Sequence, residues 1–563
     1  MADIQSGVHE ISDRYVSQYA ALHPAMATYM GIAGYDDKLT DFSPDGYAAR
    51  AELDRAALAE VQACEPTDAA SEVAKAVFAE RVGLGLENYD AGLEVGTLNV
   101  IDCPVQDIRQ VFDLMPTETA DHWAMIAKRL AAVPDAVHGV RASLEYAAQH
   151  GRPAALRQVE KVAEQCETWS GVRGDKSFFD QMVAPADGVD GVGDALRRDL
   201  EDSARAANKA YAELATYLRE GLAPKANPKD AVGEDVYRLQ SRYFLGARLD
   251  LAEAYAWGWE EFSRIEAEMK LIAERIKPGA SLAEAAELLD ADPRYQVIGQ
   301  PAFAAWMQGL SDRALADLRD VHFEIPDPVM ALECKIAPPG GSVGAYYTNP
   351  SEDFSRPGRM WWSVPADKQD FSTWREVTTV YHEGAPGHHL QCAIAVHAAE
   401  KLNTFQRMMC WVSGHGEGWA LYAERLMREL GYLDDDGNLL GMLDGQLFRA
   451  ARVVVDIGMH LELPIPAGAG FHEGERWTPE LGLEFMLNRT ITDPAHVHDE
   501  IDRYLGWPGQ APSYKLGERL WLAARDEARE RSGDAFDLKA FHTAALEMGS
   551  MGLDTLREQL AKL

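Results

Sequence analysis

Apolar residues recur at three- and four-residue spacing along most of the chain, with charged residues between them. This period places the apolar side chains on one face of a helix, whereas the alternation that is typical of a half-buried strand is scarce. The pattern therefore predicts a mainly α fold, a large multi-helix body. The segments that show it most clearly are residues 48–64, 72–88, 119–132, 192–221, 251–275 and 516–529.

Stretches rich in Gly and Pro interrupt the helical pattern. The clearest is residues 184–193, and a second break lies near residues 277–280. We predict an N-terminal helical region over residues 1–190 and a second helical region, which carries the motifs described below, over residues 191–563. The same breaks also fit surface loops within one continuous body.

Residues 334–365 are rich in Gly, Pro, Tyr and Trp and form the one region where strands are expected. Residues 344–348 and 359–364 read as two extended runs joined by a loop, which predicts a small β-hairpin or short sheet. A strand edge there can bind an extended peptide through Tyr346 and Tyr347; the alternative is a structural hairpin that packs aromatic residues into the core. Arg356 either binds a substrate carboxylate or pairs with Asp353.

The most informative motif is residues 381–389, Tyr-His-Glu-Gly-Ala-Pro-Gly-His-His. In a His-Glu-x-x-His helix the two histidines lie about 40° apart around the axis and roughly 6 Å apart along it, so both bind one zinc ion while the Glu activates water. Here the second histidine comes two residues late. On a straight helix His388 would point about 120° away from His382, and His389 would lie roughly 10 Å further along the axis.

The residues inside the motif indicate how this spacing is corrected. Pro386 has no N–H for the carbonyl of His382 and its ring clashes with that carbonyl, while glycines before and after it tolerate unusual dihedral angles. If two residues loop out, His388 becomes the second ligand; if three loop out, His389 does. We favour His388, with His389 supporting the site from behind.

A zinc ion held by two histidines needs a third protein ligand, which in helical metallopeptidases is usually a Glu on a later helix. Glu417 lies between Gly416 and Gly418 at a predicted helix start. Glu424, two turns further along the same face, would orient a ligand through a hydrogen bond. The alternatives are a carboxylate that interacts with the helix dipole for Glu417 and a solvated surface charge for Glu424.

Three motifs follow one another in the second half of the chain: residues 382–391 (HEGAPGHHLQ), 417–424 (EGWALYAE) and 508–517 (PGQAPSYKLG). Together with residues 345–358 they resemble the bacterial domain-of-unknown-function 885 family, most densely over residues 330–520. The resemblance implies a mostly helical protein that is distantly similar to helical zinc metallopeptidases of the angiotensin-converting-enzyme and neurolysin type. It implies no substrate.

Tyr514 lies in the last of these motifs, in a turn-rich stretch that can present a phenol to a cleft. It is the candidate donor to the oxyanion that forms when water attacks a carbonyl, and the competing interpretation is a buried core tyrosine. Lys515 either binds a substrate carboxylate or is solvated.

Composition limits the partners of the chain. Lys and Arg total 54 against 90 Asp and Glu, which opposes binding to nucleic acids and anionic membranes. The six cysteines show no C-x-x-C pair, so a cysteine zinc site is not indicated. We find no basic segment followed by an apolar run at the start and no run of ~18 apolar residues, so we expect a cytoplasmic protein.

The sequence thus predicts a zinc-dependent hydrolase, a metallopeptidase of short peptides. His382, His388 and Glu417 bind zinc, and Glu383 is the general base for the attacking water. One alternative is hydrolysis of another amide, such as an N-acyl amino acid or a modified peptide. Another is a non-catalytic helical binding protein with a lost metal site. The oligomeric state stays open.

Overall fold

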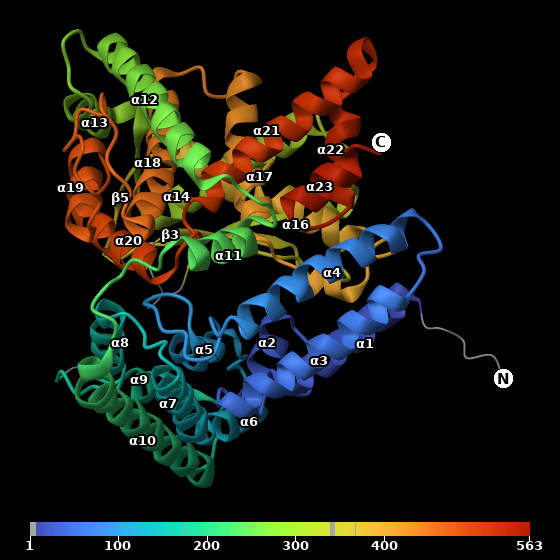
Figure 1. Ribbon diagram of the computed structural model, residues 1–563, viewed down its shortest axis with the longest axis vertical. Coiled ribbons are helices and arrows are strands. Elements are labelled where there is room, and N and C mark those ends of the chain that lie inside the picture. Colours follow the sequence, from blue (N-terminus) through green and yellow to red (C-terminus); the bar gives the residue numbers. More distant parts are fainter. Residues whose placement is uncertain (1–6, 175, 338–343, 366, 563) are drawn as a thin grey trace. The chain divides into compact units, whose positions relative to one another are not determined.

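The computed structural model describes residues 7–174, 176–337, 344–365 and 367–562. Within these residues the chain is mainly helical and has a few short strands (Figure 1). The predicted fold class is confirmed. None of the described helices is both long and apolar enough to cross a membrane.

The chain forms two compact units. Unit 1 contains the described residues of Met1–Glu65, Val82–Val232 and Asp502–Trp507, and unit 2 contains Pro66–Arg81, Gly233–Ile501 and Pro508–Leu563 as far as they are described. A division after residue 190 does not separate these units. The apolar stripe of α10 (Asp194–Thr216) packs on α6 (Ala120–Ala131) and α8 (Leu156–Trp169), so the residues from 191 to Val232 belong to unit 1.

Unit 1 is entirely helical in its described residues. Its core gathers large buried side chains such as Trp123, Phe179 and Tyr211. Besides α6, α8 and α10 it contains α1 (Val8–Leu22), α2 (Pro24–Tyr29), α3 (Pro44–Ala63), part of α4 (Ala69–Asp90), α5 (Pro104–Gln110), α7 (Val133–Gln149) and α9 (Phe178–Val183).

Unit 2 carries all of the motifs. Two helix pairs, α17 with α21 and α12 with α18, form its most extensive packing (Figure 1). Its helices are the first part of α4, α11 (Glu234–Leu245), α12 (Leu251–Ile276), α13 (Leu282–Ala291), α14 (Gln300–Leu318), α15 (Glu376–Glu383), α16 (His388–His397), α17 (Ser413–Glu429), α18 (Asp436–Leu461), α19 (Pro479–Arg489), the first part of α20 (Pro494–Gly506), α21 (Ser513–Ser532), α22 (Leu538–Glu547) and α23 (Leu553–Leu560).

Glycines allow α17 and α21 to approach closely. A Cβ atom on Gly418 would lie 2.5 Å from the carbonyl carbon of Gly517, so a larger residue at either position would push the helices apart. This contact fixes the start of α17, which carries Glu417, against the start of α21, which carries Tyr514.

A three-stranded sheet lies in the region where strands were expected. Its order is β2 (Leu332–Ile336), β4 (Gly358–Ser363), β3 (Gly344–Thr348); β4 runs parallel to β2 and antiparallel to β3. The predicted pair of extended runs is confirmed, since it corresponds to β3 and β4. β1 (Gln296–Ile298) and β5 (Asp370–Ser372) form a separate two-stranded ribbon. Among the described strands, β3 has a neighbour on one side only.

Candidate metal centre

The helix that begins the His-Glu motif ends inside it. α15 stops at Glu383, a turn covers residues 384–387, and α16 starts at His388. The predicted departure from α-helical geometry around Pro386 is therefore confirmed, and the two histidines lie at the end of one helix and the start of the next.

Close backbone packing explains why this turn needs glycine. The N–H of Gly387 donates to the carbonyl of Tyr381 (3.0 Å), two residues beyond the usual helical acceptor. A Cβ atom on Gly387 would lie 1.9 Å from the carbonyl oxygen of His382, which excludes any side chain. The indole N–H of Trp419 donates to the carbonyl of Pro386 (2.9 Å) and ties the turn to α17. The two extra residues are thus absorbed in a defined turn.

Three donor atoms meet where this turn faces α17. Nε2 of His382 lies 3.3 Å from Oε2 of Glu417, and Nε2 of His388 lies 3.6 Å from the same oxygen. In a tetrahedral zinc site with bonds of about 2.0–2.1 Å, neighbouring ligand atoms are roughly 3.3–3.4 Å apart. The two distances to Glu417 are close to this spacing, so His382, His388 and Glu417 are residues that could hold a zinc ion.

Glu383 lies beside these donors on α15. One of its carboxylate oxygens and a ring nitrogen each of His382 and His388 lie within 4.8 Å of one another. Its side chain also lines the cavity in front of the site. This position suits a general base that acts on a water molecule next to the metal.

The ionisation of the donor groups shows that the site favours positive charge. Burial lowers the pKa of His382, but hydrogen bonds to Glu417 and Glu424 outweigh burial and raise that pKa to about 9. Burial raises the pKa of Glu417, whereas the two histidines lower it, and the result lies well below the usual value. Carboxylates that draw protons onto imidazoles will also draw a divalent cation.

Glu424 holds His382 from the side away from the cavity. Nδ1 of His382 lies 2.8 Å from Oε1 of Glu424, and the hydroxyl of Thr378 donates to Oε2 (2.8 Å). Glu424 is completely buried. The contact fixes the imidazole ring with Nε2 towards Glu417, the usual arrangement of a carboxylate behind a metal-binding histidine, and places Glu424 where an orienting residue was predicted.

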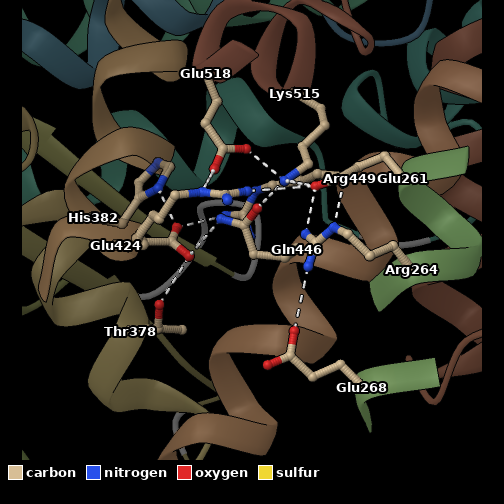
Figure 2. Close-up of polar contacts among 11 residues, drawn as sticks. Glu261, Arg264, Glu268, Thr378, His382, Glu424, Gln446, Arg449, Lys515 and Glu518 are labelled. Carbon is tan, nitrogen blue, oxygen red and sulfur yellow. Dashed lines mark hydrogen bonds and ion pairs between the residues drawn. The ribbon is translucent and has the colours of Figure 1, made fainter. Parts of the chain in front are cut away.

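Behind Glu424 lies a buried polar network that we call the rear cluster: Glu424, Gln446, Lys515, Glu518 and Glu261 (Figure 2). The amide N–H of Gln446 donates to Glu424 (3.5 Å), and its carbonyl oxygen accepts from the ammonium group of Lys515. Since an ammonium group only donates, it fixes which way the amide points. Lys515 also pairs with Glu518 (2.5 Å) and Glu261 (3.0 Å).

The position of Lys515 differs from both expectations. It is completely buried, with an exposed fraction of 0%, and it is not among the cavity-lining residues. It is therefore neither solvated nor placed to bind a substrate. The reason is the rotation of α21, which turns Tyr514 towards the cavity and Lys515 towards carboxylates on α12 and on its own next turn.

His389 is used differently from its neighbour. Its Nε2 lies 2.7 Å from the carbonyl oxygen of Val329, and its Nδ1 lies 3.0 Å from the hydroxyl of Tyr347. Burial lowers its pKa to about 4, so the ring is neutral at pH 7. Both nitrogens of His389 already have contacts, so His389 holds β3 and His388 stays the predicted second ligand.

A cavity of about 980 Å³ lies in front of the donor atoms. Tyr346 is 44% exposed at its wall and stacks on Trp361, while Tyr347 also lines it and binds His389. The cavity wall includes the edge strand β3, one face of α15 and part of α18. The lining residues are Gly344, Ala345, Tyr346, Tyr347, Asn349, Trp362, Ser363, Val364, Pro365, Lys368, Phe371, Glu376, Thr379, His382, Glu383, His388, Cys392, Trp411, Glu417, Arg449, Arg452, His496 and Tyr514.

Arg356 is not among these lining residues. It lies in the loop between β3 and β4, where its backbone N–H donates to the hydroxyl of Ser351 (2.9 Å). Asp353 instead accepts from Ser351 and Ser355 (both 2.7 Å). The structure thus gives no support to Arg356 as a substrate anchor, and none to its pairing with Asp353.

Sequence reasoning missed several cavity residues, among them Glu376, Trp411, Arg449 and Arg452. Glu376 had a signal, because it lies six residues before His382 on the face that also presents Thr379. The two arginines lie one turn apart in a helix with long apolar runs, a pattern that marks buried or cavity-facing charges. Trp411 had no signal, since only the fold brings it beside His388, at a ring distance of 5.9 Å.

The chain belongs to the family described as bacterial protein of unknown function (DUF885), whose model matches residues 24–560. No curated protein matches it. Two solved structures share its fold: a candidate lipoprotein from Colwellia psychrerythraea (TM-score 0.83, 23% identity, covering 99% of this chain and 98% of that one) and a candidate lipoprotein of unknown function from Shewanella oneidensis (TM-score 0.75, 18% identity, 99% and 100%). The likeness to zinc metallopeptidases and the cytoplasmic location stay predictions.

Proposed function

We propose that this member of the bacterial DUF885 family is a zinc-dependent hydrolase that cleaves short peptides. The observation that carries the proposal is the meeting of two imidazole nitrogens and one carboxylate oxygen, at 3.3 and 3.6 Å, at the wall of a cavity. Two imidazole nitrogens and one carboxylate oxygen suit zinc better than calcium or magnesium, which prefer shells made only of oxygen.

The protein's own groups have separate tasks. Zinc, when bound, polarises the scissile carbonyl and the attacking water. Glu383 takes the proton of that water and passes it to the leaving amine. Tyr514 donates to the developing oxyanion from the opposite helix, and the guanidinium of Arg452 lies 4.7 Å from the centre of its ring, which holds the ring at the cavity wall.

The edge strand β3 supports a peptide as the substrate. Gly344, Ala345, Tyr346 and Tyr347 line the cavity, and among the described strands β3 pairs only with β4. The outer edge of such a strand offers backbone donors and acceptors to an extended chain. A peptide bound there would pass the donor atoms of the metal centre within the same cavity.

The test combines metal content with cleavage. Native protein, Glu383→Gln and the matched control Glu530→Gln, an exposed carboxylate on α21, are loaded with zinc and incubated with a library of short peptides. We expect about one zinc per chain in all three proteins, and a rate for Glu383→Gln that is lower by a factor on the order of 10² or more. A Glu383→Gln protein that cleaves as fast as native protein would contradict the mechanism. Zinc-loaded native protein that cleaves no peptide would turn the search to other amides.

A further inference from the structure

Two arginines of α18 face the cavity. Arg449 and Arg452 lie one helical turn apart, and both line its wall, as does Tyr514. The remainder of the helix between residues 437 and 460 is almost entirely buried. Two guanidinium groups at one cavity cost electrostatic free energy unless anions compensate their charges. An arginine that has no close anionic partner within the protein is therefore available to an anionic ligand.

Arg452 already has an anion. Its Nη2 donates to Glu500 (2.8 Å), and its guanidinium stacks on the rings of Phe448 and Tyr514 at 5.2 and 4.7 Å. The residue is only 8% exposed. Its charge is therefore compensated inside the protein, and its role is to support the cavity wall.

Arg449 is placed differently. Its Nη2 lies 3.8 Å from Oε1 of Glu424, which is too long for a hydrogen bond. That carboxylate already accepts from Thr378 and contacts His382, both at 2.8 Å. Nε of Arg449 is buried and has no hydrogen-bond partner among the described residues, while the side chain keeps an exposed fraction of 19%. The guanidinium fork is thus held beside the metal centre with donors to spare.

The chemistry of this fork indicates its ligand. A guanidinium group presents paired N–H donors whose geometry matches a carboxylate. Oε1 of Glu424 lies 2.8 Å from Nδ1 of His382 and 3.8 Å from Nη2 of Arg449, so a single carboxylate oxygen separates the fork from a proposed zinc ligand. One or two extended residues, at about 3.3 Å each, span such a separation.

We propose that Arg449 binds a carboxylate of the substrate, so that the preferred substrates carry a carboxylate one or two residues from the bond that is cleaved. This proposal rests on the proposed peptide hydrolase activity, because it assigns a subsite of the same cavity. The carboxylate belongs either to the C-terminus of a peptide or to an Asp or Glu side chain.

Binding to a non-cleaving protein tests the proposal without turnover. Zinc-loaded Glu383→Gln is titrated by calorimetry with three peptides of one apolar sequence: the free acid, the C-terminal amide, and an amide with Glu in the last position. A charged hydrogen-bond pair predicts that the free acid binds about tenfold or more tightly than the plain amide. If the Glu-containing amide matches the free acid, the site reads side chains as well as termini.

The variants assign the effect to Arg449. In Arg449→Gln the ratio of the affinities for the free acid and the amide should fall towards one, and in Arg449→Lys it should be intermediate. The matched control is Arg519→Gln, which removes an arginine that pairs with Glu253 on the surface, and there the ratio should be unchanged. The proposal would be overturned if the ratio of affinities is near one in the protein that keeps Arg449, or if the ratio is unchanged in Arg449→Gln. It would also be overturned if none of the peptides binds. If Arg449→Gln does not fold, the native and Arg449→Lys ratios decide.

Failure of the proposed function has a different signature. A native protein that holds no zinc contradicts the zinc hydrolase, and one that holds zinc but cleaves no peptide of the library contradicts peptides as the substrate. The ratio of affinities between free acid and amide is instead measured with the non-cleaving protein. The two outcomes are therefore read from separate experiments.

Discussion

The two sides of the metal centre are built on opposite principles. On the cavity side, His388, Glu417, Glu383 and Arg449 line one cavity, and Nδ1 of His388 and Nε of Arg449 have no hydrogen-bond partner among the described residues. In the rear cluster, each group is shared by neighbours, as Lys515 is by two carboxylates and an amide (Figure 2).

This contrast explains how reactive groups can be kept in place. Incompletely paired polar groups are costly when buried, and they persist only where the surrounding structure fixes them. The rear cluster supplies that support, because Lys515 orients Gln446, Gln446 and Thr378 orient Glu424, and Glu424 orients His382. The cavity side is therefore free to bind metal and substrate.

The largest expected effect is the loss of bound zinc when a proposed ligand on the cavity side is removed. His388→Ala should lose nearly all bound zinc, because two donors rarely hold zinc in a protein. The matched variant His389→Ala removes the adjacent ring, whose nitrogens contact Val329 and Tyr347, and should keep roughly one zinc per folded chain. Elemental analysis of dialysed protein measures both, and equal zinc loss in the two variants would contradict the assignment of His388.

The next effect breaks the rear cluster. Lys515→Met leaves Glu518 and Glu261 without their shared ammonium group and should lower the free energy of unfolding by about 3–5 kcal/mol. Urea denaturation of the metal-free protein gives the value. Lys270→Met, which removes an exposed pair with Glu266, should have little effect. A similar stability for both variants would show that the rear cluster is not needed for the fold.

Tyr514→Phe tests the cavity side without touching the metal. If the phenol donates to the oxyanion, the variant keeps its zinc and raises the activation barrier for peptide cleavage by about 2–4 kcal/mol. Tyr146→Phe in unit 1 is the control and should cleave at the native rate. An unchanged rate in Tyr514→Phe would remove this residue from the mechanism.

The smallest expected effect comes from Glu424, the member of the rear cluster that contacts His382. Glu424→Gln weakens the support of His382 without removing a ligand, so zinc affinity should fall by roughly 10–100-fold. Competition with a chromophoric chelator measures the affinity, and Glu429→Gln, an exposed position on the same helix, serves as the control. Native affinity in Glu424→Gln would mean that the rear cluster does not act on the metal centre.

The sequence predicted the parts of the site whose geometry is local. Helical periodicity, the break at Pro386 and the Gly-flanked position of Glu417 follow from neighbouring residues and backbone sterics, and the structure has them where expected. The extended runs that became β3 and β4 were also local signals.

What could not be predicted depends on distant partners. The burial of Lys515 requires Glu261, far away in the chain on α12, and the placement of Arg449 requires Glu424 on another helix. The contacts of His389 with Val329 and Tyr347, which favour His388 as the proposed second ligand, lie outside the motif and follow from no spacing argument within it. Such contacts are decided by packing between helices, and a periodic pattern specifies only which face of a helix is apolar.

The most direct test of the central claim is anomalous diffraction at the zinc edge from crystals of native protein grown with zinc. We expect one strong anomalous peak bonded to Nε2 of His382, Nε2 of His388 and a carboxylate oxygen of Glu417, at about 2.0–2.2 Å from each. A map with no peak between these three side chains, or with zinc bound through His389, would contradict it.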